Sequence, residues 1–379
     1  MKKFFYCLGG MLVFFCLLGS CSMGGEKPKD LLESEETTKK EKEKEAASED
    51  EKVSEDETLN EEEENPDKAQ DEAQDDPEDI PPPAVFVICK TLPENEIVFE
   101  FSGSVSLVSL NFDLDLGYEV IEEGSKLKIK LTKDPDPGLS VKADLQVKDE
   151  YDNTVSEHIT FRTRNNNVPN LQINELRTLY KNLQAEYIEF KMLSDGNLGA
   201  LRVFAVSNDT APLIYIFEPV AVKEGEYVVL HLRKLEESCR DEYGDSLDES
   251  GGTDSNPKAR DFWIHGSNKL LRDTDAVYVL DQDDKVLDAV MFAVNANSWL
   301  NKNYFSETSR LLFDQGAWKS ATGTVCSAAD VVNSSGIGTA MTRSISRDET
   351  AENTHSAIDW YITANSGVTP GQKNNPKRL

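Results

Sequence analysis

Histidine, the side chain most often used for proton transfer and metal binding near neutral pH, is scarce in this sequence. The four histidines form neither a His-Glu-x-x-His pair nor part of a Cys-x-x-Cys pattern: they are His158, His231, His265 and His355. The Gly-x-Ser-x-Gly turn of many hydrolases and the phosphate-binding P-loop are absent as well. We therefore predict that the protein is not an enzyme.

Positive charge is also in short supply. The chain has 70 acidic and 40 basic side chains, a formal net charge of −30. Residues 81–379 alone hold 45 acidic and 30 basic side chains, a net charge of −15. Because such a surface repels a phosphate backbone, we expect no nucleic acid among the partners.

Long hydrophobic runs are lacking beyond residue 20, so the sequence predicts no spanning helix, which needs roughly 20 apolar residues. The one marked apolar stretch, residues 4–18, follows Lys2 and Lys3 and ends in small residues, as a secretory signal peptide does. We assign residues 1–20 to that signal. Its last residues and the next one, Leu18-Gly19-Ser20-Cys21, resemble the lipobox of bacterial lipoproteins.

The lipobox resemblance implies that Cys21 becomes the first residue of the mature chain and carries a diacylglycerol, often with a third acyl chain such as palmitate. Two or more acyl chains hold a protein stably on a bilayer. The first expected partner is therefore a lipid bilayer, at the cell membrane or the outer membrane, and the chain is either periplasmic or surface-exposed. We expect no other cofactor.

Residues 21–83 are predicted to be a disordered acidic tether. Between residues 26 and 80 there are 25 acidic and 8 basic side chains, a net charge of −17, and almost nothing apolar. A segment of this kind buries too little apolar surface to offset the entropy lost on ordering. As a flexible coil it would span about 45 Å, so the folded part can stand away from the lipid.

The expected fold class is all-β, with two immunoglobulin-like β-sandwich modules after the tether. For residues 84–164 we expect strands near 85–88, 97–101, 105–110, 126–131, 143–147 and 158–161, because apolar and polar residues alternate or run together there. Leu127 and Ile129 alternate with lysines, which puts them on one face. This segment resembles the immunoglobulin-like modules of bacterial surface proteins.

Residues 165–379 resemble the lamin-tail domain family. The likeness rests on the strand-like segments 170–176, 185–190, 198–204, 222–232, 275–280 and 286–290, and on the closing motifs Ser346-Arg347-Asp348, Asp359-Trp360 and Thr369-Pro370-Gly371. The resemblance implies an immunoglobulin-like sandwich used for binding or structure. Residues 236–260 and 293–343 depart from a compact version of the family, and we interpret them as insertions.

The 293–343 insertion is rich in aromatic residues, and long loops often carry function. Trp299, Tyr304 and Trp318 are candidates for a ligand-facing cluster. The alternative is that they pack as a helix or flap over an open sheet edge.

Two further sites rest on spacing alone. Cys239 and Cys326 are candidates for a disulfide outside the cytoplasm, whereas Cys89 lies in an apolar strand and suits a buried thiol. Asp281, Asp283 and Asp284 lie between two strand-like segments, where they form either a calcium site or a solvated hairpin.

Together these observations favour a membrane-anchored envelope lipoprotein. It would display a noncatalytic binding, adhesion or scaffolding module whose partner is a protein or glycan of the envelope or of a host. Two alternatives stay open: an envelope hydrolase acting on a glycan or phosphoester from a site in residues 293–343, and a purely structural spacer.

Overall fold

The computed structural model describes residues 82–379, apart from residues 208–210, 267, 321–322 and 324–325. The segments expected to be a signal peptide and an acidic tether, including the expected lipid attachment residue Cys21, lie outside the described residues, except for the last two residues of the tether. Within the described part, no helix combines the length and the apolar composition that crossing a bilayer requires. Most of the regular structure is β-strand, so the all-β prediction is confirmed.

The first group of strands forms one antiparallel array in the order β3-β4-β2-β5-β6, with β1 also paired to β2. Its members are β1 (Phe86–Leu92), β2 (Glu96–Phe112), β3 (Tyr118–Glu122), β4 (Gly124–Leu131), β5 (Ser140–Asp149) and β6 (Thr154–Arg162), with a short 3₁₀ turn, η1 (Pro93–Asn95). The two strands expected near 97–101 and 105–110 are halves of the single strand β2.

Strand β2 joins two layers, because its first half pairs with β1 and β4 and its second half with β5. The pairing changes between Glu100 and Val105. On β4 the predicted alternation is confirmed: Leu127 and Ile129 are buried, while the lysines point outward and pair with glutamates, as Lys128 does with Glu96 at 2.6 Å. The buried side chains of this group form a hydrophobic core of their own.

The second group of strands forms two main sheets. One has the order β11-β10-β15-β16-β17 and the other β14-β13-β8-β7-β18-β19. The first comprises β10 (Arg202–Ala205), β11 (Leu213–Ile216), β15 (Asp275–Leu280), β16 (Val286–Ala293) and β17 (Val332–Asn333). The second comprises β7 (Leu171–Arg177), β8 (Tyr187–Met192), β13 (Tyr227–His231), β14 (Ala259–Trp263), β18 (Ile345–Arg347) and β19 (Trp360–Ile362). A two-residue pair, β9 (Gly196–Asn197) with β12 (Ala221–Val222), stands apart.

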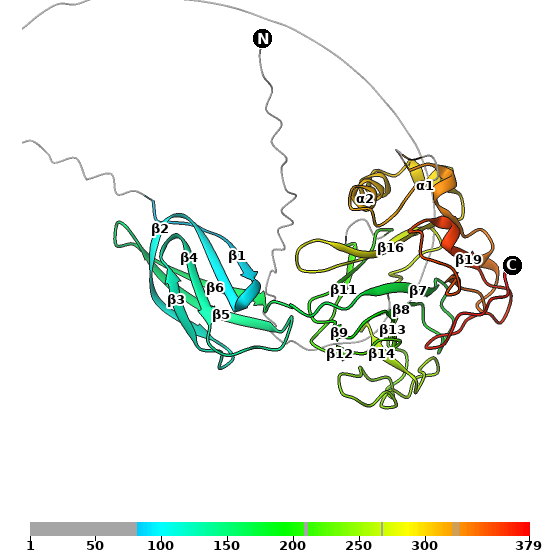
Figure 1. The fold of residues 1–379 in the computed structure, drawn as a ribbon, viewed down its shortest axis with the longest axis horizontal. Coiled ribbons are helices and arrows are strands. Elements are labelled where there is room, and N and C mark those ends of the chain that lie inside the picture. Colours follow the sequence, from blue (N-terminus) through cyan, green and yellow to red (C-terminus); the bar gives the residue numbers. More distant parts are fainter. Residues whose placement is uncertain (1–81, 208–210, 267, 321–322, 324–325) are drawn as a thin grey trace, which may run out of the picture. The chain divides into compact units, whose positions relative to one another are not determined.

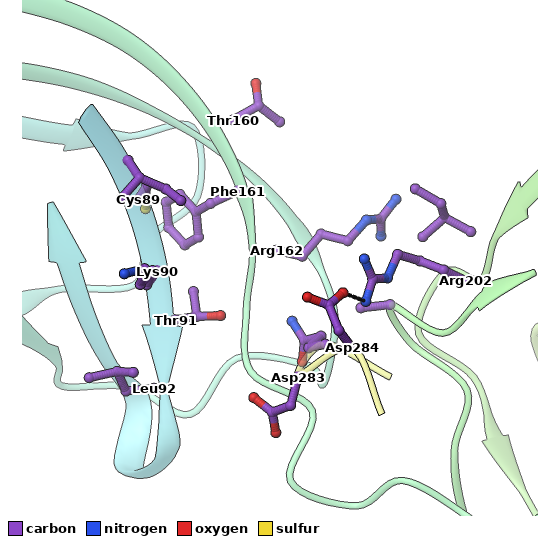
Figure 2. A pocket seen from close by; sticks show the side chains of 14 residues that line it. Cys89, Lys90, Thr91, Leu92, Thr160, Phe161, Arg162, Arg202, Asp283 and Asp284 are labelled. Carbon is purple, nitrogen blue, oxygen red and sulfur yellow. Dashed lines mark hydrogen bonds and ion pairs between the residues drawn. The ribbon is translucent and has the colours of Figure 1, made fainter. Parts of the chain in front are cut away.

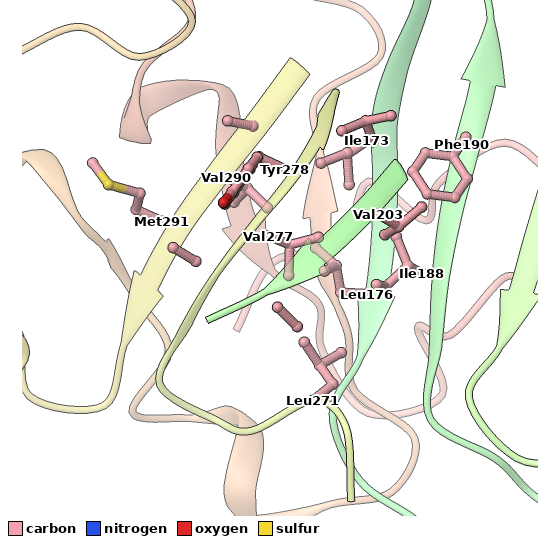
Figure 3. Close-up of a cluster of buried hydrophobic side chains, with 14 of the residues drawn as sticks. Ile173, Leu176, Ile188, Phe190, Val203, Leu271, Val277, Tyr278, Val290 and Met291 are labelled. Carbon is pink, nitrogen blue, oxygen red and sulfur yellow. The ribbon is translucent and has the colours of Figure 1, made fainter. Parts of the chain in front are cut away.

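The core of this module lies between the two sheets (Figure 3). Ile173 on β7 and Phe190 on β8 are buried in the same cluster as Val277 on β15 and Val290 on β16. Helices α1 (Ala296–Leu300) and α2 (Asn303–Asp314) pack against β16 and β15, and their side chains Trp299, Phe305 and Leu312 belong to the same buried cluster (Figure 1). Short 3₁₀ turns follow at η2 (Ala328–Asp330), η3 (Ile337–Thr339) and η4 (Ala357–Asp359).

The segment expected to be an insertion at 236–260 is a crossover connection. Strands β13 and β14 run parallel, with Tyr227 opposite Ala259 and His231 opposite Trp263. A parallel neighbour can be reached only by a connection that returns along the whole strand, which takes a dozen or more residues. Residues 232–258 supply that return path, and the last two residues of the expected insertion already belong to β14.

Candidate functional site

The outer face of the second sheet is unusually polar for a buried surface. On β8, Ile188 and Phe190 face the core, so strand alternation places Tyr187, Glu189 and Lys191 on the opposite face. Glu175 on β7 is the direct cross-strand partner of Glu189. We call Glu175 and Glu189 the carboxyl pair. Both side chains are fully buried.

The chain end covers this face. Residues 363–379, the C-terminal strap, follow β19, and Val368 of the strap packs against a small apolar cluster that includes Tyr187 and Val229. Glu175 accepts a hydrogen bond from the backbone N–H of Thr369 at 3.0 Å. Glu189 accepts one from the backbone N–H of Gly371 at 2.5 Å. The Thr369-Pro370-Gly371 motif is thus bound directly to the carboxyl pair.

Other donors complete the environment of the carboxyl pair. Glu175 also accepts from the hydroxyls of Tyr187 and Ser344, both at 2.5 Å, and Glu189 accepts from the side-chain amide of Asn174 at 2.7 Å. Burial raises the pKa of Glu175, against the effect of these hydrogen bonds. Burial also raises the pKa of Glu189, and the charge of Glu175 raises it further.

Glu349, which follows β18, has a different environment. Its carboxylate binds the ammonium of Lys191 and accepts from the hydroxyl of Tyr227 at 2.9 Å and from the backbone N–H of Asn374 at 2.6 Å. Burial alone would raise the pKa of Glu349, but the hydrogen bonds from Lys191, Asn374 and Tyr227 outweigh it and lower the pKa. The strap is therefore bound by an ion-paired carboxylate as well as by the carboxyl pair.

The crossover connection holds the strap from the other side. Asn256 donates its side-chain amide to the carbonyl of Pro370 at 3.0 Å. Gly371 has a φ of 72°, and a Cβ at this position would lie 2.6 Å from the Cβ of Ala259. A glycine is required here because any other side chain would be strained and would collide with β14.

Arg347, from the Ser346-Arg347-Asp348 motif, joins the two sheets of the module. Its guanidinium donates to the carbonyl of Ile173 at 2.7 Å and to the carboxylate of Asp288 on β16 at 2.6 Å. It also lies over the ring of Trp360, 4.4 Å from the ring centroid. Arg347 and Asp288 are both almost fully buried, so this ion pair is part of the module's interior.

Two cavities open beside this network, and Asp348 and Glu349 line both of them. The larger measures about 540 Å³, and its lining comes from the β18 end, β19 and the strap: Asp348, Glu349, Thr350, Tyr361, Thr369, Lys373, Asn374, Asn375 and Pro376. The smaller, of about 220 Å³, is lined mainly by charged and amide side chains, among them Lys191, Arg347 and Glu352. Asn374 lines the larger cavity, and its buried side-chain oxygen has no hydrogen-bond partner. The larger cavity is our candidate binding site.

The aromatic cluster expected to face a ligand is instead part of the core. Trp299 and Trp318 are 0% and 1% exposed, and Trp299 stacks on Phe305 with ring centroids 4.7 Å apart. Tyr304 is partly buried against the same cluster. The structure agrees with the alternative interpretation, in which these residues belong to a helical segment that packs against the sheet. Helix packing removes these apolar rings from water, which explains the difference.

The three aspartates considered for calcium form the predicted β15–β16 hairpin. Asp281 accepts from the backbone N–H groups of Asp283 and Lys285, so its oxygens shape the turn. Asp283 pairs with Arg164, and Asp284 pairs with Arg202 at 2.7 Å beside a pocket of about 490 Å³ (Figure 2). The described residues contain no group of three or more His, Cys, Asp or Glu side chains arranged to hold a metal ion. The arginines take the place that a cation would need.

The candidate disulfide is not formed, because Cys239 and Cys326 are both free. Cys239 is buried beside Trp263, so tightly that a Cβ at Gly252 would lie 2.6 Å from its Sγ. Cys326 lies at the edge of the main core, and its thiol is directed toward the carbonyl of Ser327, 3.8 Å away. Each thiol thus has its own neighbours. Cys89 is free as well.

Sequence reasoning did not find the carboxyl pair. In the sequence, Glu175 and Glu189 are polar residues within the expected strand segments 170–176 and 185–190. The sequence does contain a signal for a buried glutamate, since glutamates are rare in strands and Glu189 follows two apolar strand formers, Tyr187 and Ile188. Burial by a segment almost 200 residues away is what the local pattern does not reveal.

A family model matches the second module, and two known proteins resemble parts of the chain. The family model TP_1001_2nd, described as a protein second domain, matches residues 169–362. An uncharacterized protein of Treponema pallidum (strain Nichols) is 31% identical over 173 residues, which make up 43% of this chain and 43% of that protein. The chain thus spans less than half the length of this relative.

A solved structure gives a weaker likeness. The crystal structure of a DUF4876 family protein from Bacteroides thetaiotaomicron covers 58% of this chain and 80% of its own, with 13% identity and a TM-score of 0.22. The match to the family model, in contrast, begins just before β7 and ends with β19. It therefore includes the carboxyl pair and Arg347, and it stops where the strap begins.

Proposed function

The chain belongs to the TP_1001_2nd family through residues 169–362, and on this premise we propose that these residues form a noncatalytic binding module of the cell envelope. In this proposal the module is carried on a lipid anchor at Cys21, and the larger cavity, beside the strap, receives its partner. The partner is a protein or glycan of the envelope or of a host.

The observation that carries the proposal is that polar groups next to the larger cavity are bound to the chain segments around it. The carboxyl pair binds backbone N–H groups of the strap, and Arg347 binds Asp288 and the carbonyl of Ile173. These groups hold loops in place around the cavity. With the strap held by these bonds, the cavity has a defined shape and a polar lining, which suits recognition because little conformational entropy is lost when a partner binds.

The lipid anchor is supported by the sequence Leu18-Gly19-Ser20-Cys21 and can be tested by labelling. Cells that express the full chain are grown with tritiated palmitate. We expect label in the wild type and in Cys16→Ala, whose altered cysteine lies inside the signal peptide. Label should be lost in Cys21→Ala. Label that persists in Cys21→Ala would rule out the anchor at this residue.

Binding is tested with residues 22–379, the expected mature chain without Cys21, in co-sedimentation with isolated envelopes. Lys373 lines the larger cavity, whereas Lys377, four residues later on the same exposed strap, is not among its lining residues. We expect Lys373→Glu to lower the bound fraction severalfold and Lys377→Glu to leave it near the wild-type value. Equal binding by the two variants would contradict a partner in this cavity.

A further inference from the structure

We propose that the C-terminal strap is a pH-dependent cover, closed over the sheet when the carboxyl pair holds a proton and released when both carboxyl groups are ionised. The proposal rests on the position of the pair. Glu175 and Glu189 are opposite each other on neighbouring strands, both are fully buried, and each accepts a backbone N–H of the strap. It concerns the strap itself and holds whatever the larger cavity binds.

The groups around the carboxyl pair do not neutralise two negative charges. From β8, Tyr187 offers a hydroxyl and Lys191 is bound to Glu349. From the end of β7, the guanidinium of Arg177 is paired with Asp254. In the described part of the chain, the hydrogen bonds to the pair come from hydroxyl, amide and backbone donors: Tyr187, Ser344, Ser346, Thr369, Asn174 and Gly371.

Two further ionisable groups face the pair and do not relieve it. Tyr227 on β13 and Glu349 after β18 contribute a phenol and another negative charge near Glu189. Tyr361 on β19, a third such group, contributes a phenol near Glu175 and does not relieve the pair either. Side chains directly opposite each other on paired strands have Cβ atoms about 4.5–5.5 Å apart, and like charges there are destabilising. Two carboxyl groups in such a site tend to share one proton.

The direction of the pH effect follows from linkage. The pKa values of Glu175 and Glu189 are raised in the closed state, first of all because burial disfavours the ionised form. When the strap is released, water reaches the pair and the pKa values return toward the ordinary glutamate value of about 4.3. The closed state therefore binds protons more tightly, and its stability falls as the pH rises through the raised pKa values.

Release of the strap changes the larger cavity, because the strap supplies much of its lining. Thr369, Lys373, Asn374, Asn375 and Pro376 all belong to the strap and to the wall of this cavity. The bond from Asn374 to Glu349 and the bond from Asn256 to Pro370 lie outside the pair. These contacts keep the strap near the sheet, so release is a local opening and not unfolding of the module.

Hydrogen exchange of the full mature chain, measured between pH 5 and pH 8 and corrected for the intrinsic exchange rate, tests the proposal. In the wild type we expect protection of the amides in residues 364–379 to fall severalfold as the pH rises, because the closed state binds protons more tightly than the released state. Protection within β16 should change much less. Protection of the strap that is constant across this range would overturn the proposal.

Two variants separate the pair from other carboxylates. Glu189→Gln removes one ionisable group at constant shape, so the pH dependence of strap protection should become weaker, because only one carboxyl group of the pair is left. Glu224→Gln is the control, since Glu224 is an exposed carboxylate in the turn before β13, and it should retain the wild-type pH dependence. If Glu189→Gln fails to fold, Glu175→Gln takes its place. The same pH dependence in the wild type and in the pair variant would refute the role of the pair.

Discussion

A single side chain, Arg347, connects parts of the second module that are far apart in the sequence. It binds the carbonyl of Ile173 and the carboxylate of Asp288, 174 and 59 positions away. Burying an ion pair costs desolvation free energy, which is recovered only when each charge is well satisfied. Removing one partner leaves the other charge buried and unpaired, so residues of this kind tolerate substitution poorly.

We expect Arg347→Ala to lower the free energy of unfolding by about 3–5 kcal/mol, because Asp288 would lose its partner. Urea denaturation of the mature chain measures this. The matched control is Arg378→Ala, which removes an exposed guanidinium that pairs with Asp348. Its effect should be at most about 1 kcal/mol. Similar losses in the two variants would show that the buried ion pair is not important for stability.

The buried carboxyl group of Asp275, at the start of β15, should make the stability of the protein depend on pH. Burial raises its pKa to about 6, although Ser207, Arg272 and Ala276 donate hydrogen bonds to the carboxylate. A carboxyl group whose pKa is raised by folding stabilises the folded protein fully at pH values below 3.8, the pKa in the unfolded chain. This contribution is lost as the pH rises through about 6. The size for a fully buried group is roughly 3 kcal/mol.

The comparison of wild type with Asp275→Asn isolates this contribution. Free energies of unfolding measured from pH 4 to pH 7 should decrease more in the wild type than in the variant, because an amide does not titrate. Other ionisable groups affect both proteins equally. If the two curves run parallel over this interval, the carboxyl group of Asp275 is not responsible.

At the scale of elements, the sequence predicts long apolar strands well and short polar ones poorly. The runs at 275–280 and 286–290 stand out because β15 and β16 are buried on both faces. Strand β14 contains Arg260 and Asp261 and looks like the end of a polar loop. Strands β18 and β19 have three residues each, too few for a periodic signal.

The candidate site was less predictable than the sheets for a related reason. The motifs at 346–348 and 369–371 can be identified in the sequence from the family resemblance. Their partners, Asp288 and the carboxyl pair, come from distant strands. Local patterns indicate which residues form a strand. They do not indicate which polar side chains a later segment will cover.

Helices α1 and α2 also contain residues whose burial the local sequence pattern does not indicate, and this can be tested. Trp299 is fully buried against Phe305, so Trp299→Ala should lower the free energy of unfolding by about 3–5 kcal/mol through the cavity it creates. The control Asn301→Ala changes an exposed residue two positions later, and a change within about 0.5 kcal/mol is expected. Urea titrations compare the two. An unchanged midpoint in Trp299→Ala would place this ring outside the core.

At the scale of the whole molecule, the described residues are held together by two main hydrophobic cores and buried polar contacts, and Cys89, Cys239 and Cys326 form no disulfide. The free thiols Cys89, Cys239 and Cys326 allow a simple check. Burial raises the pKa of Cys89 and of Cys326 to about 12, and both should react slowly with a thiol reagent in the folded protein.

Denaturing the mature chain of a Cys21→Ser variant in guanidinium without reductant should expose all three thiols. A count of one would indicate a bridge between Cys239 and Cys326. The Cys239→Ser variant serves as a reference, with an expected count of two.

The parallel pairing of β13 and β14 places a lower limit on the length of the chain between them. A family member in which residues 232–258 were shortened to a few residues would be unable to bring a parallel strand beside β13. Its sheet would end at β13, and Asn256, which binds Pro370, would have no counterpart. The length of this one segment therefore sorts relatives, from sequence alone, into those that can anchor a chain end across the sheet as this protein does and those that cannot.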